Sequence, residues 1–306
     1  MLSPKPKTPK PNPIRLKKRK RMTICAAFKS MYGVVLSADT QETLGSTKIR
    51  IPKLVIKPHV GEPTDKVRML FAGAGDGIFV DRLIEEMWKA AERCKGTKIG
   101  EVFEDVETAL VDWHTKIWKV YAGTGDKPDS ELIFAIYVPR EIRLYKAFGP
   151  TVTEIQDYAF IGCGRELAEF LVDHVRVDTD SIEEDFATSL YIICNVKEHV
   201  DDCGGDTQIA ALFLDGSIQT MNTYQAGQLT QGIQDIARSI FYLFSVACNS
   251  ESSRDDVNRT ARGTATEINR IRAALKKSVP DRVRVSQELK DSVQTLYQRI
   301  EWPPTD

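Results

Sequence analysis

Strand-like and helix-like patterns follow one another along this chain in blocks, and their order limits the possible folds. Strand patterns at 24–28, 34–38, 49–57 and 67–75 precede two consecutive amphipathic helix patterns at 78–95 and 99–121. The next blocks are strands at 132–138, 142–148 and 158–162, helices at 164–174 and 181–198, and strands at 207–214 and 217–222. Two antiparallel sheets with helices on both outer faces would bury every apolar stripe. The order therefore predicts an α+β fold, a four-layer αββα sandwich.

Local signals refine this prediction. A turn around Tyr32 and Gly33 joins the first two strands as a hairpin. Pro52 lies inside the third strand pattern, which places that strand at an edge or a bulge. Ser181 followed by Glu184 has the spacing of a capping box at the start of a helix.

The chain divides into three parts. From about Leu229 to the end, the pattern predicts three helices, separated by the polar run 248–256 and by Pro280. We expect a basic, proline-rich and disordered leader at 1–22, a core domain at 23–228 and a helical C-terminal extension at 229–306.

Charge is distributed unevenly between these parts. Residues 1–22 hold nine of the 42 Lys and Arg residues and none of the 43 Asp and Glu residues, which leaves a net charge of −10 on the remainder. An acidic folded part argues against nucleic acid as its main partner. The basic cluster at 17–21 fits a nuclear-type address or a polyanion tether, and equally a translation start that lies at Met22 instead.

Composition sets the broad class. Apolar residues make up 42% and charged residues 28%, as in ordinary globular proteins, and the absence of an 18-residue apolar run predicts no membrane span. The six cysteines form no CxxC pair, which indicates a reducing cytoplasm. A zinc set of His174, His199 and a nearby cysteine fits no metal motif, so we expect neither a metal nor a cofactor.

Thr23 is the candidate nucleophile. Asp39 follows it by 16 residues, and Lys53 lies in the basic run 48–57. A threonine hydroxyl attacks poorly unless a base takes its proton, and its own α-amine is such a base when the chain begins at Thr23. That amine, with a pKa of roughly 8, is free only when residues 1–22 are gone.

These three residues, the run SADTQETLGSTKI (37–49) and the block order together resemble the proteasome β-type family of N-terminal nucleophile hydrolases. The family includes the peptidase subunit of the bacterial two-component ATP-dependent protease. The resemblance spans Thr23 to about Met221. Asp39 stands at the family's offset from the nucleophile, whereas Lys53 comes two residues early and implies a shortened turn between Gly45 and Pro52.

The resemblance implies a role for each site residue. Thr23 would attack, Lys53 would lower the pKa of the nucleophile, and Asp39 would hold Lys53 charged and oriented. Gly73 would give the backbone N–H that stabilises the oxyanion, at a place where a side chain would obstruct the substrate. The substrate-binding residues would be Thr43, which pairs with the peptide as an added strand, Phe71, at the first specificity pocket, and Gly75.

The chain departs from the family pattern at three places. Cys163 replaces the serine usual between two glycines, and Cys203 replaces another in the run HVDDCGGD (199–206). The catalytic aspartate of that run falls on Asp201 or Asp202, of which we take Asp202. Met22 stands where self-cleaving members have glycine, which suits removal by methionine aminopeptidase rather than autolysis.

The resemblance predicts a threonine endopeptidase that works inside a homo-oligomeric compartment, a ring or helical stack, fed by a separate ATPase unfoldase. Two alternatives stay open: a non-catalytic structural subunit whose N-terminus is blocked, and a small-molecule amidase of the same superfamily. GAGDG at 73–77 also resembles a phosphate-binding loop, but two helices follow it instead of a second strand. Cys163 has no evident histidine partner, which favours packing over a nucleophilic role.

Overall fold

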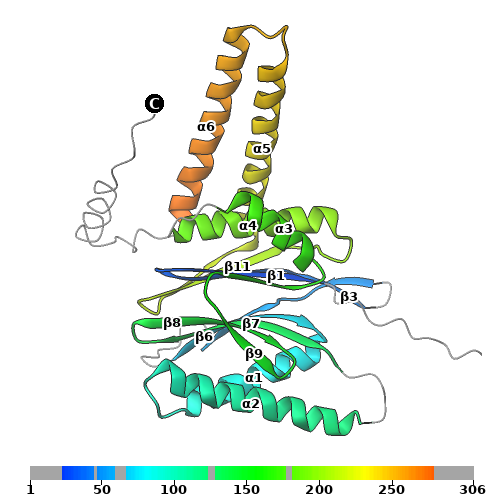
Figure 1. The fold of residues 1–306 in the computed structure, drawn as a ribbon, viewed down its shortest axis with the longest axis vertical. Coiled ribbons are helices and arrows are strands. Elements are labelled where there is room, and N and C mark those ends of the chain that lie inside the picture. The colour runs from blue at the N-terminus through cyan, green and yellow to red at the C-terminus, as the bar shows by residue number, and fades with distance from the viewer. Residues whose placement is uncertain (1–22, 45–46, 59–66, 123–127, 177–180, 279–306) are drawn as a thin grey trace, which may run out of the picture.

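A computed structural model describes residues 23–44, 47–58, 67–122, 128–176 and 181–278. The leader at 1–22 and the helix predicted after Pro280 lie outside the described residues. Two five-stranded antiparallel sheets stack face to face, and helices cover both outer surfaces (Figure 1). The predicted αββα sandwich is therefore confirmed.

The first sheet has the strand order β10-β1-β2-β11-β12. Its strands are β10 (Tyr158–Gly162), β1 (Ile24–Ser30), β2 (Gly33–Asp39), β11 (Thr207–Phe213) and β12 (Ile218–Met221). All seven residues of β2 are buried, because the strand is central and both of its faces are covered. The β1–β2 pair is the predicted hairpin, with Ser30 opposite Gly33.

The second sheet has the order β5-β6-β7-β8-β9. Its strands are β5 (Leu54–Lys57), β6 (Arg68–Gly75), β7 (Ser130–Val138), β8 (Glu141–Phe148) and β9 (Thr151–Ile155). The strand predicted at 49–57 is in fact two strands: residues 51–53, with Pro52 at the centre, separate β4 (Thr47–Arg50) from the edge strand β5. Proline cannot donate to a ladder, so the pairing stops there. β4 pairs with β3 (Gln41–Leu44) in a separate two-stranded hairpin.

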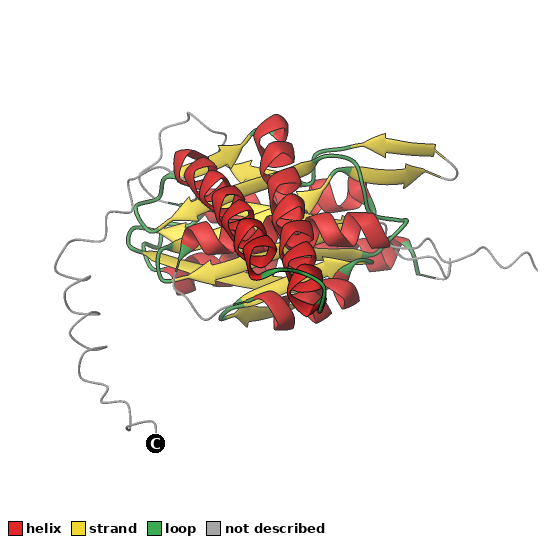
Figure 2. Cartoon of the chain, turned by 90° about the horizontal axis from the view of Figure 1, so that it is seen from above, coloured by secondary structure: helices red, strands yellow, loops and turns green. Residues whose placement is uncertain are grey.

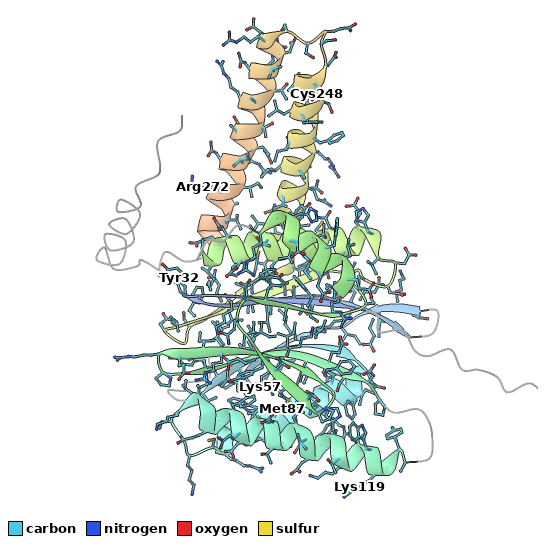
Figure 3. The ribbon with its side chains drawn as sticks, in the orientation of Figure 1. Tyr32, Lys57, Met87, Lys119, Cys248 and Arg272 are labelled. Atoms are coloured by element: carbon cyan, nitrogen blue, oxygen red, sulfur yellow. The ribbon has the colours of Figure 1, made fainter. Side chains whose placement is uncertain are left out.

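Three apolar layers hold the sandwich together. One lies between the sheets, and a second joins sheet two to α1 (Gly77–Arg93) and α2 (Ile99–Val120). The third joins sheet one to α3 (Arg165–Val175) and α4 (Ile182–His199). Met87 of α1, labelled in Figure 3, is fully buried in the second layer. Each helix pair thus buries its apolar stripe against one sheet, as the block order requires.

The C-terminal helices form an antiparallel hairpin that projects from the α4 side (Figures 1 and 2). They are α5 (Thr223–Cys248) and α6 (Arg254–Ser278). α5 begins six residues before the predicted start near Leu229, because Asn222 and Gln225 form a capping box there. The capping box predicted at Ser181 is absent: the Ser181 hydroxyl donates to Glu183 instead.

Candidate active site

The hairpin of β1 and β2 brings Thr23 and Asp39 together. Thr23 directly precedes β1 and is 3% exposed, and Asp39 ends β2 with no exposed surface. Because Cys25 lies opposite Ala38 in this antiparallel pair, the two residues meet at the open end of the hairpin. A separation of 16 residues in sequence becomes a hydrogen bond of 2.5 Å from Thr23 Oγ1 to Asp39 Oδ1.

Asp39 collects four donors with its two carboxylate oxygens. Oδ1 accepts from the Thr23 hydroxyl, from the Ile24 backbone N–H at 3.1 Å and from Lys53 Nζ at 2.7 Å. Oδ2 accepts from the Gly204 backbone N–H at 2.9 Å. An ionised carboxylate only accepts hydrogen bonds, so all four contacts suit the charged form.

Lys53, in the segment between β4 and β5, joins Thr23 and Asp39 as the third member of this group. Its side chain is 10% exposed, and its ammonium bonds the Asp39 carboxylate, the Gln41 carbonyl at 2.5 Å and the Thr23 hydroxyl oxygen. Its backbone N–H donates to Gln208 Oε1 of β11 at 2.7 Å. The Thr23 hydroxyl therefore donates to the Asp39 carboxylate and accepts from the Lys53 ammonium, and the ammonium is the group that would stabilise negative charge on its oxygen.

Gly73 lies on β6 next to this group. Its backbone N–H points at the Lys53 carbonyl at a long 3.4 Å. A Cβ at Gly73 would lie 2.4 Å from Val80 Cγ1 of α1. The close approach of α1 thus excludes a side chain here, a different reason from the obstruction of substrate that the sequence suggested.

A turn between β10 and α3 closes the site from the other side. Gly162, with a φ of +91°, packs so tightly on Thr23 that a Cβ would lie 2.2 Å from the Thr23 carbonyl oxygen. That oxygen accepts from the Gly164 N–H at 3.3 Å and from the Cys163 thiol at 3.4 Å. Glycine is required at Gly162 both by its left-handed backbone and by this contact.

A second turn, between α4 and β11, carries Asp202 and Cys203 and contacts Cys163 of the first turn. Cys203 Sγ lies 3.4 Å from Cys163 Sγ, and Asp202 is close enough to act electrostatically on the Cys163 thiol. The hydrogen bond between the two thiols lowers the pKa of Cys163 and raises that of Cys203. Burial raises the pKa of the third nearby thiol, Cys25, to about 12, so it stays protonated.

The predicted substrate-binding residues lie in three settings. Thr43 is on β3, opposite Lys48 of β4. Phe71 is fully buried and stacks on Phe134 in the layer beneath α1 and α2. Gly75 is exposed at the end of β6, opposite Ser130. Their contact with a substrate stays a prediction.

Sequence reasoning missed two residues that shape the site. Glu131 of β7 is 1% exposed, and its carboxylate accepts the Gly162 N–H at 2.8 Å. Gln208 holds the backbone of Lys53 through its side-chain oxygen. A charged residue at the head of the apolar run 132–138 was the available signal for Glu131. The polar residue within the apolar run 207–214 was the signal for Gln208.

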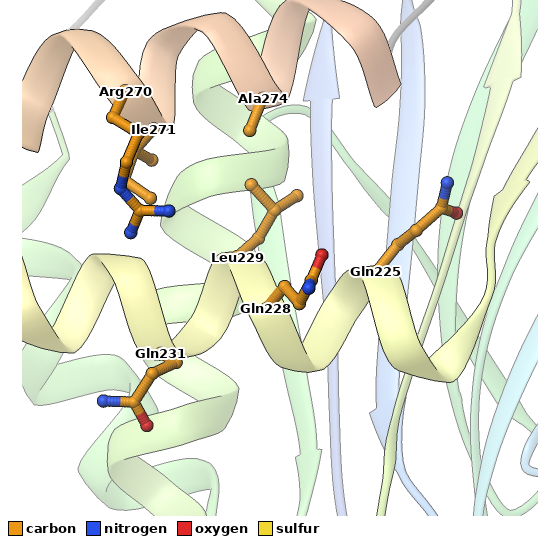
Figure 4. A pocket seen from close by; sticks show the side chains of 7 residues that line it. All are labelled: Gln225, Gln228, Leu229, Gln231, Arg270, Ile271 and Ala274. Carbon is orange, nitrogen blue, oxygen red and sulfur yellow. The ribbon is translucent and has the colours of Figure 1, made fainter.

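A hollow of about 430 Å³ lies elsewhere, between α5 and α6 (Figure 4). It is lined by Gln225, Gln228, Leu229, Gln231, Arg270, Ile271 and Ala274. Because only α5 and α6 line it, it belongs to the hairpin rather than to the Thr23 site. The described part of the chain contains no cluster of three or more side chains suited to a metal ion. None of its described helices combines the length and apolarity needed to cross a bilayer.

Comparison with known proteins identifies the fold of the chain. Neither a protein-family model nor a curated protein sequence matches the chain. Solved structures do match. Anbu (ancestral beta-subunit) from Yersinia bercovieri superposes with a TM-score of 0.59 at 15% identity, covering 72% of this chain and 97% of its own. Anbu from Hyphomicrobium sp. strain MC1 gives a TM-score of 0.57 at 14% identity, covering 72% and 97%.

A third match is to the helical assembly of the Anbu complex from Pseudomonas aeruginosa, with a TM-score of 0.57 at 11% identity, covering 72% of this chain and 96% of that one. The chain is thus structurally similar to Anbu subunits and shares their proteasome-like fold. At these identities the likeness establishes the fold alone.

Proposed function

We propose that this chain, which has the proteasome-like fold of the Anbu subunits, is a threonine endopeptidase with Thr23 as its nucleophile. One observation carries the proposal: a buried threonine hydroxyl lies between the Asp39 carboxylate and the Lys53 ammonium. A structural threonine needs no such pair, because burying two charges costs several kcal/mol per ion. Charges that lower the barrier of a reaction give a functional reason to keep such a pair despite its cost in stability.

The reaction begins with loss of the Thr23 proton. The free α-amine of Thr23 takes it once residues 1–22 are removed, and Thr23 Oγ1 attacks the carbonyl carbon of the scissile peptide bond. Lys53 holds positive charge against the oxygen as it becomes an alkoxide. Asp39 holds Lys53 in place through their ion pair.

The tetrahedral intermediate then collapses. The Gly73 N–H turns from its long contact with the Lys53 carbonyl to the oxyanion. The protonated amine gives its proton to the leaving amine, the peptide C–N bond breaks, and an ester remains on Thr23. Water, deprotonated by the same amine, hydrolyses the ester and restores the hydroxyl.

The free edge of β3 is the proposed binding site for the substrate strand. The Gln41 N–H donates to Gly204, and the Gln41 carbonyl accepts from Lys53, so both groups point away from β4. Alternate residues of a strand direct their backbone groups to the same side. Thr43, two residues later, therefore directs its N–H and C=O to the side on which Lys53 lies, where an extended peptide would pair as an added strand.

A homo-oligomer is the proposed setting. Anbu from Pseudomonas aeruginosa is described as a helical assembly. On α5 of this chain, four neighbouring side chains are at least half exposed: Ile240 at 51%, Phe241 at 71%, Tyr242 at 62% and Phe244 at 63%. We call them the α5 aromatic face. Exposed apolar side chains so close together on one helix suit contact with another copy of the chain. An ATP-driven unfoldase, as a separate chain, would supply substrates to the compartment.

The test combines the mature N-terminus with activity. Intact mass and N-terminal sequencing of the native protein should show a chain that begins at Thr23. That protein should cleave fluorogenic peptides, and the Thr23→Ala and Lys53→Met variants should lose this cleavage. The variant Lys89→Met, at a lysine of α1 whose side chain is 47% exposed, is the matched control and should keep it. Equal activity in the wild type and Thr23→Ala would refute the proposal.

A non-catalytic structural subunit is the second candidate. It is favoured by one observation, that 22 residues precede Thr23 in this chain and would block its amine. A native protein that still carries those residues, and assembles without cleaving peptides, would support it.

A further inference from the structure

Two cysteine thiols touch each other beside Thr23. Cys163 lies in the turn between β10 and α3, and Cys203 lies in the turn between α4 and β11, 40 residues later. Their sulfur atoms are 3.4 Å apart. Cys163 is partly exposed, whereas Cys203 is only 4% exposed. Elements distant in sequence thus bring one accessible and one buried thiol into contact.

Both cysteines belong to the turns that hold the site. The Cys163 thiol donates to the Thr23 carbonyl, and the next residue, Gly164, donates to the same oxygen. Gly204, which follows Cys203, donates its N–H to Asp39. A change in the distance between the two sulfurs therefore acts on Thr23 from one side and on Asp39 from the other.

The two thiols are chemically unequal. Their shared hydrogen bond favours the thiolate at Cys163, whose pKa it lowers, and the protonated thiol at Cys203, whose pKa it raises. A thiolate that solvent can reach is the form that peroxides oxidise, and an adjacent thiol can resolve the product. The other described cysteines, Cys25, Cys94, Cys194 and Cys248, are free as well, and the Cys25 thiol donates to the Gly73 carbonyl at 3.5 Å.

We propose that Cys163 and Cys203 form a reversible disulfide on exposure to hydrogen peroxide, and that this bond switches off the Thr23 site. The Cys163 thiolate attacks one peroxide oxygen and becomes a sulfenic acid, with release of hydroxide. The Cys203 sulfur then attacks the Cys163 sulfur, and the sulfenic hydroxyl leaves as water with the Cys203 proton. The hydroxide released in the first step takes up the proton that Cys163 lost on ionisation and is the second water. In sum, two thiols and one peroxide give one disulfide and two waters.

The geometry indicates why the bond would inhibit. A disulfide has a sulfur–sulfur length of about 2 Å, so the two sulfur atoms must approach by about 1.4 Å from the present contact, which pulls on the two turns that carry them. Oxidation also removes the Cys163 S–H that donates to the Thr23 carbonyl. A displacement of about 1 Å at reacting groups can cost on the order of 10²-fold in rate. The inhibition rests on the proposed function, whereas formation of the bond does not.

The experiment treats the native oligomer with graded hydrogen peroxide, blocks free thiols with N-ethylmaleimide and maps tryptic peptides. Cleavage after Lys146, Arg165, Lys197 and Arg238 places each cysteine alone in its peptide, 147–165 and 198–238. We expect these two peptides to become linked, with the mass of two hydrogens lost. Peptide cleavage should fall at least about tenfold and return with dithiothreitol.

Two variants control the test. Cys248→Ser removes the exposed cysteine at the distal end of α5 (Figure 3) and should leave both linkage and inhibition unchanged. Cys203→Ser should instead accumulate sulfinic acid on Cys163, and dithiothreitol should not reverse it. Absence of the linked peptides at peroxide levels that oxidise Cys248, or linkage without inhibition, would overturn the proposal. If the reduced protein shows no Thr23-dependent cleavage, the proposed function fails, and the peptide map still decides whether the disulfide forms.

Discussion

The buried ion pair of Asp39 and Lys53 gives the sharpest energetic prediction. Their side chains are 0% and 10% exposed, and the N–O distance is 2.7 Å. Replacing Lys53 by methionine keeps the length of the side chain but leaves a buried carboxylate without its counter-ion. Breaking a buried pair in this way typically costs 3–5 kcal/mol. Asp39 would retain donors from Thr23, Ile24 and Gly204, so we expect a loss of unfolding free energy near 3 kcal/mol.

The reverse change, Asp39→Asn, removes the other charge. An amide nitrogen in place of Oδ2 would direct a donor at the Gly204 N–H, and the Lys53 ammonium would face a neutral amide oxygen in place of a carboxylate. We again expect a loss of about 3 kcal/mol. The double variant removes both charges and should lose less than the two single losses together, by at least about 1 kcal/mol. Each of the three variants should lose Thr23-dependent peptide cleavage.

The measurement is a double-mutant cycle by denaturant unfolding. The matched control is a cycle on Arg143 and Glu141, whose N–O distance is also 2.7 Å but whose side chains are 38% and 44% exposed. Exposed pairs couple by about 0.2–1 kcal/mol. Equal coupling in the two cycles would mean that burial does not strengthen the Asp39–Lys53 pair. Such a result would remove the reason to regard the Asp39–Lys53 pair as catalytic rather than structural.

Three further predictions follow from other features. Gly162→Ala should destabilise the chain by more than about 2 kcal/mol and abolish cleavage, because its Cβ would meet the Thr23 carbonyl. Gly149→Ala, at a φ of +56° with open space around it, should cost only about 1 kcal/mol in the same denaturant-unfolding assay. Burial raises the pKa of Asp185 to about 6, above its unfolded value, so stability should fall from pH 4 to pH 6 by about 2–3 kcal/mol. Asp185→Asn should remove that slope and raise the free energy of unfolding at pH 7.5. Phe244→Asp on the α5 aromatic face should reduce the oligomer measured by light scattering, and an unchanged mass would exclude this face from the interface.

The fold was predictable because its information is local and periodic. Each helix pair carries its own apolar stripe, and the block order leaves few ways to bury all the stripes. β9 was missed because its burial pattern is mostly exposed or intermediate, which weakens the alternation that marks a strand. The split at Pro52 and the start of α5 depend on single backbone hydrogen bonds, which periodicity does not report.

The site was predictable only in part, and Glu131 shows the physical reason. Thr23 and Asp39 lie on one hairpin, so their spacing in sequence already implies contact. Glu131 reaches Gly162 from the other sheet, and that contact depends on how the two sheets stack. Cys163 and Cys203 also meet only through tertiary packing, because Cys163 lies between β10 and α3 whereas Cys203 lies between α4 and β11. Spacing identifies the groups that would react, whereas the groups that hold them in place become visible only once the layers are packed. Variants of Glu131, Gln208 and Cys203 therefore test residues that position this site and that sequence motifs alone do not identify.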